Sequence, residues 1–188
     1  MNKDKMVERL KTKISEKRFV HSLGVEYTAA CMAFVHGADV EKARIAGLLH
    51  DCAKGLSQKE KLEKARKHGL KISAYEEKNP DMLHAKLGAW YAKSKYEVED
   101  EEILSAIRWH TTGKPDMSLL DKIIFVADYI EPNRKPVPKL DKIRKLAFTD
   151  LDRAVVLILK NTISYLEELG EEMDDSTKKT LDYYTKKM

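Results

Sequence analysis

Apolar residues recur with helical spacing along almost the whole chain. Met6, Leu10 and Ile14 mark a first short helix, and Gly37 closes a longer one predicted over residues 18–35. One side of that second helix forms an apolar stripe made of Val20, Leu23, Tyr27, Ala30, Cys31 and Phe34. The pattern therefore predicts helices from the start of the chain.

The next predicted helix, over residues 40–53, carries Ala43, Ala46, Gly47 and His50 along one side. Because the side chains before the histidine are small, a neighbouring helix can approach this side closely. The helix leads directly into the pair formed by His50 and Asp51, and Gly55 follows shortly after.

Helix start and stop signals divide the rest of the chain. Ser57 begins a capping box for a polar helix that Gly69 closes, and Asn79 with Pro80 begins the next helix. Further helices are predicted around 103–110, from Ser118 to about 130, over 140–147 and over 150–169, followed by a helical tail from residue 176. We find no alternating strand pattern and no internal linker, so we predict an all-α, single-domain helical bundle spanning residues 1–188.

Charge and cysteine content narrow the class of protein. The 188 residues include 35 basic and 31 acidic side chains, a net charge of +4, and the two signs alternate along the chain. A nucleic-acid interface needs clustered basic residues, so we expect no nucleic-acid partner. No apolar run approaches a membrane span, and the charged start lacks a signal region; we therefore expect no membrane association and a cytoplasmic location, with Cys31 and Cys52 as reduced thiols.

Ionisable residues within apolar helical segments are the candidate chemistry. His50 and Asp51 follow an apolar run, and Asp128 follows the run 123–127, although burying such groups is costly unless they are paired or bind a metal. Three further histidines lie in similar helical contexts: His21, His84 and His110. A shell of imidazole and carboxylate groups suits a divalent transition metal such as iron or manganese better than a thiolate-rich zinc site does. Neighbours on a helix point about 100° apart, so the adjacent pair can face one ion only near a helix end.

The order of these residues resembles the HD-domain metal-dependent phosphohydrolases, and within them the bacterial YqeK family of symmetrical diadenosine tetraphosphate hydrolases. The resemblance covers about residues 18–169 and rests on five stretches: RFVHSLGV (18–25), LLHDCAK (48–54), LHA (83–85), WHTTG (109–113) and FVADYIEPNR (125–134). The last two make the assignment to the subfamily specific.

The resemblance implies a role for each candidate residue. The metal ligands are expected to be His21, His50, Asp51 and Asp128. The catalytic residues are expected to be Asp51, Lys54, His84 and His110, the two histidines either completing a second metal site or binding phosphate. Substrate contacts are expected from Arg18, Asp51, Lys54, His84, His110, Thr111, Asp128, Arg134 and Met173.

The resemblance also implies the reaction and the partners. We expect one or two divalent metal ions, iron above all, with manganese or cobalt as alternatives. The expected substrate is a dinucleoside polyphosphate, cleaved by metal-activated water to two ADP. Exposed apolar positions on the late helices, together with the family likeness, favour a homodimer. The alternatives are an HD phosphohydrolase for a deoxynucleotide, a guanosine polyphosphate or a cyclic dinucleotide, a non-catalytic nucleotide-binding module, and a purely structural helical protein.

Overall fold

The computed structural model describes residues 1–188 and is built from helices without strands. The elements are α1 (Lys3–Lys11), α2 (Glu16–His36), α3 (Val40–Leu49), α4 (Gln58–Lys67), α5 (Ala74–Lys78), the 3₁₀ helix η1 (Pro80–Met82), α6 (Leu83–Tyr96), α7 (Glu101–Trp109), α8 (Leu119–Ile130), α9 (Leu140–Ala147), α10 (Leu151–Leu169) and α11 (Asp175–Lys187). The predicted all-α class is confirmed. None of these helices combines the length and the apolarity needed to cross a lipid bilayer.

Helix ends coincide with residues that satisfy free backbone groups. Ser57 and Glu60 form the predicted capping box of α4, while Gly37 and Gly170 end α2 and α10 in the left-handed conformation. A second capping box, at Ser73, begins the short helix α5, which the apolar pattern alone did not predict. Local capping chemistry therefore sets most of the element boundaries.

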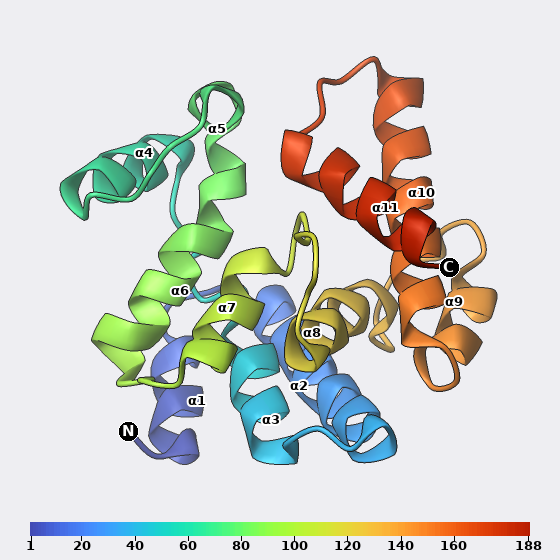
Figure 1. Ribbon diagram of the computed structural model, residues 1–188. Coiled ribbons are helices and arrows are strands. Elements are labelled where there is room, and N and C mark those ends of the chain that lie inside the picture. The colour runs from blue at the N-terminus through green and yellow to red at the C-terminus, as the bar shows by residue number, and fades with distance from the viewer.

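Helix α3 packs against α2, α7 and α8 (Figure 1). Its close approach to α2 depends on Gly47, because a Cβ atom there would lie 2.9 Å from the Cα of Glu26. The helix ends at Leu49 rather than at the predicted Ala53, and His50 caps it. As a result His50 and Asp51 lie at a helix end, the place where two adjacent side chains can face one point.

Two helical arms extend from this core. α4 and α5 form one arm, and α10 with α11 forms the other, on the opposite side of the segment that joins α7 to α8 (Figure 1). The arms meet where Tyr75 and Lys78 of α5 contact Glu172, in the segment between α10 and α11. The segment after α7, which includes Thr111, therefore lies between the two arms.

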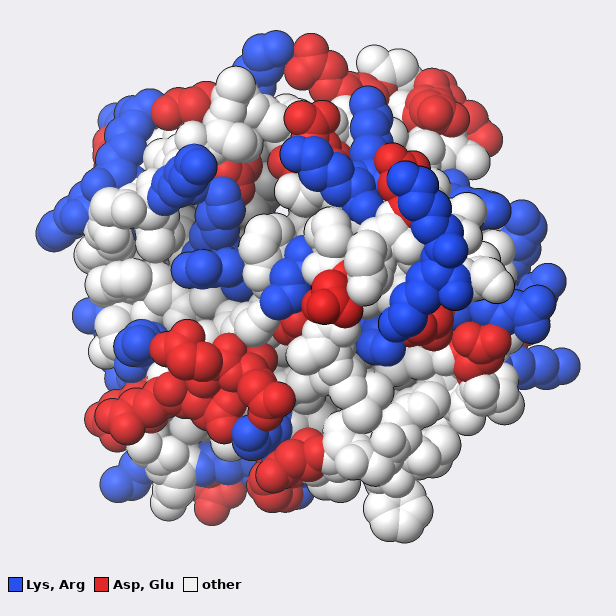
Figure 2. Space-filling view, viewed as in Figure 1, with Lys and Arg blue, Asp and Glu red and all other residues white.

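Most of the apolar stripe on α2 lies outside the core, although Leu23 packs against it. Val20, Tyr27 and Phe34 are 45%, 60% and 80% exposed, whereas the side of α2 that packs inside carries Val25 and Met32. The surface over α2, at the lower right of Figure 2, accordingly shows few charged side chains. Helical spacing identified a continuous face, and the structure shows that the face points outward.

Candidate metal and catalytic centre

Side chains from five segments of the core converge on one point. Three overlapping sets of ligand atoms, each within 4.8 Å of one another, bring together His21, His50, Asp51, His84, His110 and Asp128. We call these six residues the His/Asp cluster. They come from α2, the turn after α3, α6, the end of α7 and α8. The sequence grouped the same six residues, and the structure brings all of them together.

Three of the cluster histidines are oriented by the backbone of their own segment. The Nδ1–H of His50 donates to the carbonyl of Gly47 at 2.7 Å, and that of His110 donates to the carbonyl of Ile107 at 2.8 Å. His84 makes the same bond to the carbonyl three residues before it. With Nδ1 protonated in each ring, all three present an Nε2 lone pair to the centre of the cluster.

His21 is held differently, by side chains. Its Nδ1 bonds to Glu131 at 3.1 Å and its Nε2 lies 3.0 Å from an Asp128 oxygen. Burial lowers the pKa of His21, but the bonds to Asp128 and Glu131 outweigh it and raise the pKa to about 9. Without a metal, His21 therefore carries a proton between two carboxylates, and a metal bound at Nε2 would take that proton's place.

The donor set fits a divalent metal. The Nε2 atoms of His84 and His110 lie 3.1 Å apart, and burial lowers the pKa of His84 well below its ordinary value. Each of the two rings is bonded to the backbone through Nδ1, so both turn Nε2 toward the same point. In addition, His50 Nε2 and an Asp51 oxygen are buried without any hydrogen-bond partner. Buried polar atoms left unpaired in this way are costly, and a cation at the centre would satisfy them.

Asp51 lies between the histidines and two basic side chains. One oxygen is 3.4 Å from His84 Nε2 and 3.9 Å from Lys54 Nζ, and the other is 3.6 Å from Arg18. Burial raises the pKa of Asp51, but the imidazoles and Lys54 more than offset this and hold it well below its ordinary value. Asp51 is therefore a carboxylate, and it belongs to two of the three sets of ligand atoms.

Lys54 and Thr111 border the cluster. Lys54 Nζ lies 3.0 Å from His84 Nε2, and burial lowers the pKa of this ammonium although Asp51 and Asp128 oppose it. The Thr111 hydroxyl lies 3.2 Å from His84 Nε2 and 3.1 Å from that of His110. Both side chains thus lie within reach of a group bound at the cluster.

Two of the predicted substrate contacts lie away from the cluster. The guanidinium of Arg134 is exposed, lies over the ring of Tyr129 at 5.2 Å and makes no ion pair. Met173 is half-buried between α10 and α11, and Asp174 rather than Met173 lines the small cavity described next. Neither Arg134 nor Met173 therefore belongs to the His/Asp cluster.

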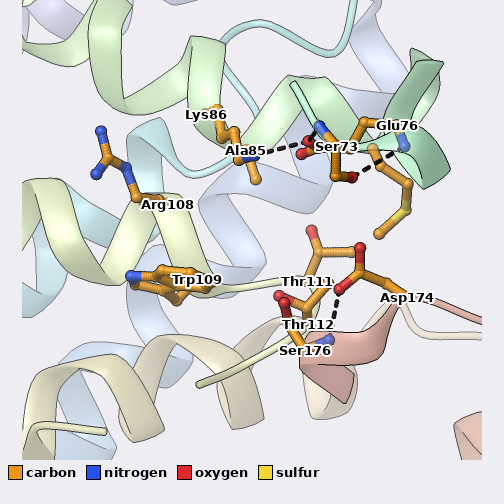
Figure 3. A pocket seen from close by; sticks show the side chains of 11 residues that line it. Ser73, Glu76, Ala85, Lys86, Arg108, Trp109, Thr111, Thr112, Asp174 and Ser176 are labelled. Atoms are coloured by element: carbon orange, nitrogen blue, oxygen red, sulfur yellow. Dashed lines mark hydrogen bonds and ion pairs between the residues drawn. The ribbon is translucent and has the colours of Figure 1, made fainter. Parts of the chain in front are cut away.

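A cavity of about 90 Å³ opens beside Thr111, between the two arms. In Figure 3, Thr111, Asp174 and Ser176 lie on one side of it. Glu76 and Lys86 lie on the other side, joined by a 2.7 Å ion pair. The cavity therefore lies between Thr111 and the contact between the arms, and no residue of the His/Asp cluster lines it.

Sequence reasoning missed Glu131 as a functional residue. It is 2% exposed, bonds to His21, and accepts the backbone N–H of Asn133 at 2.7 Å. A carboxylate behind a metal-binding histidine fixes the ring and raises its basicity. The sequence does carry a signal for this residue: in the stretch FVADYIEPNR (125–134), Glu131 directly follows the apolar end of α8.

Comparison with known proteins places this arrangement in a family. Residues 18–133, more than half of the chain, match the HD domain. The chain belongs to the HD domain family. It is 43% identical over 166 residues to a protein of Halalkalibacterium halodurans named "Bis(5'-nucleosyl)-tetraphosphatase, symmetrical", covering 88% of each chain. A Bacillus subtilis protein of the same name is 40% identical over 177 residues, covering 94% of each.

A solved structure supports the fold of this HD-domain chain. It is described as a predicted HD superfamily hydrolase involved in NAD metabolism from Clostridium acetobutylicum, and it aligns with a TM-score of 0.97 at 39% identity. The alignment covers 100% of this chain and 99% of the other. The single-domain helical fold of the HD family, and the likeness to symmetrical tetraphosphatases that the motifs indicated, are therefore confirmed.

Proposed function

We propose that this HD-domain chain is a metal-dependent hydrolase that cleaves diadenosine tetraphosphate symmetrically to two ADP. The observation that carries the proposal is the His/Asp cluster, in which a buried nitrogen of His50 and a buried oxygen of Asp51 lack a hydrogen-bond partner. The relatives named symmetrical bis(5'-nucleosyl)-tetraphosphatase, similar over most of their length, support the choice of substrate.

We propose His21, His50, Asp51 and Asp128 as the residues that hold the metal. When bound, a divalent metal supplies Lewis acidity and lowers the pKa of water to near neutrality, which provides a hydroxide for attack on phosphorus. Imidazole and carboxylate ligands favour iron, with manganese or cobalt as substitutes. His84 and His110 lie on the other side of Asp51 and serve either a second ion or the substrate phosphate.

The chain's own basic and hydroxyl groups have a second task, to bind the polyphosphate. Lys54 lies beside Asp51 and can neutralise charge that grows on phosphoryl oxygens during attack. Its lowered pKa also makes the ammonium a better proton donor to the terminal phosphate oxygen of the departing ADP than an exposed lysine is. The Thr111 hydroxyl can donate a hydrogen bond to the same phosphate.

We propose that the part of the substrate that extends beyond the cluster contacts Arg18, Arg134 and Met173. Arg18 is 42% exposed beside Asp51, where its guanidinium can contact phosphate in bidentate fashion. We propose that Arg134 leaves the ring of Tyr129 to bind the far end of the polyphosphate, and that Met173 packs against a base. The residues 18–169 form the catalytic core in this proposal, and the chain acts as one domain in the cytoplasm.

Product identity tests the proposal. Protein stripped of metal and reloaded with iron, manganese or cobalt is incubated with diadenosine tetraphosphate, and the nucleotides are resolved by anion-exchange chromatography. ADP as the sole product supports it. ATP with AMP, turnover only of a deoxynucleotide, guanosine polyphosphate or cyclic dinucleotide, or tight ADP binding without turnover each contradict it. Elemental analysis of the purified protein identifies the native metal.

We also propose that the chain forms a homodimer through the outer face of α2. Between residues 19 and 35, Glu26 is the only Asp, Glu, Lys or Arg and it is buried, whereas these residue types make up 35% of the chain; His21 faces the cluster. Val20, Tyr27 and Phe34 repeat every seven residues, the spacing of a two-helix seam, and the repeat is symmetric about Tyr27. A second copy packed antiparallel on this face would place Val20 against Phe34 in both directions.

The dimer proposal has a matched control on a late helix. Phe34→Glu places a charge on the α2 face, whereas Tyr165→Glu places one at a 61% exposed position on α10. Sedimentation should give a monomer for Phe34→Glu and a dimer for Tyr165→Glu and the parent. A monomeric parent, or dissociation only by Tyr165→Glu, refutes the α2 interface.

A further inference from the structure

A second cavity lies behind the turn that carries His50 and Asp51. Its volume is about 320 Å³, and it is bounded by α1, α6 and residues 52–56. No residue of the His/Asp cluster lines it. We call it the α1–α6 cavity; the two helices that bound it lie side by side at the lower left of Figure 1. It is therefore a separate site that the proposed hydrolysis does not use.

The charges around the α1–α6 cavity have a single sign. Arg9, Lys13 and Lys95 line it, and no acidic residue does. None of the three makes an ion pair within the chain: Arg9 donates to the Lys95 carbonyl and lies 5.5 Å from the centre of the Tyr96 ring. Most other basic groups near the core of this chain, such as Arg44 and Lys61, are paired with carboxylates. Three unpaired cations around one hollow favour an anionic ligand.

The remaining wall of the α1–α6 cavity is apolar and aromatic. Leu56, Cys52 and the rings of Tyr91 and Tyr96 form it. Tyr96 is only 3% exposed, and neither tyrosine hydroxyl bonds to another group of the chain. Tyr91 is half-buried, and since both hydroxyls are free of partners in the chain they remain available to a ligand. A flat ring can pack between Tyr91 and Leu56 while its charged end meets the cations.

We propose that the α1–α6 cavity binds a nucleoside monophosphate, with the base against Leu56 and Tyr91 and the phosphate at Arg9, Lys13 and Lys95. Pockets for small organic ligands have volumes of roughly 300–1,000 Å³, so this one suits a mononucleotide and is too small for a dinucleoside polyphosphate. Cys52 and Gly55 belong to the turn that also holds Asp51, so the ligand would rest on the back of the catalytic segment.

The test is a calorimetric titration of the full-length protein with AMP, and with inorganic phosphate and adenosine as partial probes. The test variant is Lys13→Glu/Lys95→Glu, and the control is Lys11→Glu/Lys93→Glu, which changes the net charge equally on the same part of the chain. All four lysines are exposed, so neither variant disturbs the core, and Lys11 and Lys93 do not line the cavity.

We expect AMP to bind the parent and the control alike, more tightly than phosphate or adenosine, and the test variant at least tenfold more weakly. Adding AMP should change the fluorescence of Trp90, whose ring lies 5.5 Å from that of Tyr91, in the parent and the control, and should leave the fluorescence of the test variant at its own ligand-free value. AMP affinity equal in the test and control variants would show that AMP binds outside this cavity and overturn the proposal. Phosphate binding as tightly as AMP, or no AMP binding at all, would overturn it too.

Discussion

Replacing Glu131 by glutamine tests whether the residue behind His21 controls metal affinity. One carboxylate oxygen bonds to His21 Nδ1 at 3.1 Å, and the other accepts two bonds from Asn133, at 2.7 and 3.2 Å. Glutamine is almost the same size but offers one acceptor oxygen and an NH₂ group. Whichever way the amide turns, it places a donor against a donor, at His21 or at Asn133.

The expected size of the effect follows from the charge that is lost. A hydrogen bond to a charged group contributes about 1.5–3 kcal/mol, and second ligand-shell substitutions typically weaken metal binding by about 10–100-fold. We therefore expect Glu131→Gln to raise the Kd for Mn²⁺ by about 10–100-fold, equivalent to about 1.4–2.8 kcal/mol. The buried position of Glu131 keeps solvent from compensating for the lost charge.

The measurement is a calorimetric titration of metal-stripped protein with Mn²⁺ at pH 7.5. Glu99→Gln is the control, since Glu99 is exposed and makes no ion pair or side-chain hydrogen bond. Circular dichroism of both variants verifies the helical fold. A well-folded Glu131→Gln variant that binds Mn²⁺ within twofold of the parent would refute the argument that this carboxylate supports His21 as a ligand.

Three further outcomes are expected. Gly47→Ala should lower the free energy of unfolding by about 1–3 kcal/mol in urea titrations, because the new Cβ lies 2.9 Å from the α2 backbone; an unchanged midpoint would contradict this packing. Asp51→Ala should abolish hydrolysis of diadenosine tetraphosphate and Asp128→Asn should do so with the fold intact, and normal turnover by either would show that the site is misassigned. In the monomeric Phe34→Glu variant, iodoacetamide at pH 8 should modify the exposed Cys31 and spare Cys52, whose thiol pKa burial raises, as read out by peptide mass mapping; equal labelling would contradict the buried position of Cys52.

The cluster could be predicted from the sequence because ionisable residues that will be buried stand out next to apolar runs. His50, Asp51 and Asp128 follow apolar runs, and only mutual contact or a metal explains such positions. The helix end at the adjacent pair was predicted from geometry, but its position was four residues off, because the turn begins before Gly55 rather than at it.

Other features were beyond the reach of the pattern. Helical spacing shows that Val20 and Tyr27 share a face of α2, but not whether core or solvent covers that face, since both core and interface faces are apolar. Glu131 contacts a residue 110 positions away, and no local rule links the two. The α1–α6 cavity likewise depends on α1 meeting the far end of α6, a tertiary contact without a local signal.

The oxygens that accept the Nδ1–H bonds of His50, His84 and His110 belong to the main chain, so they are present whichever side chain their residue carries. Substitutions in the surrounding helices leave these three rings aimed inward as long as the helix ends keep their places. The ring on α2 has no such protection, because its anchor is a carboxylate that a single base change can remove. Evolution or design that adapts the site to a different ion can therefore begin most readily with substitutions around His21.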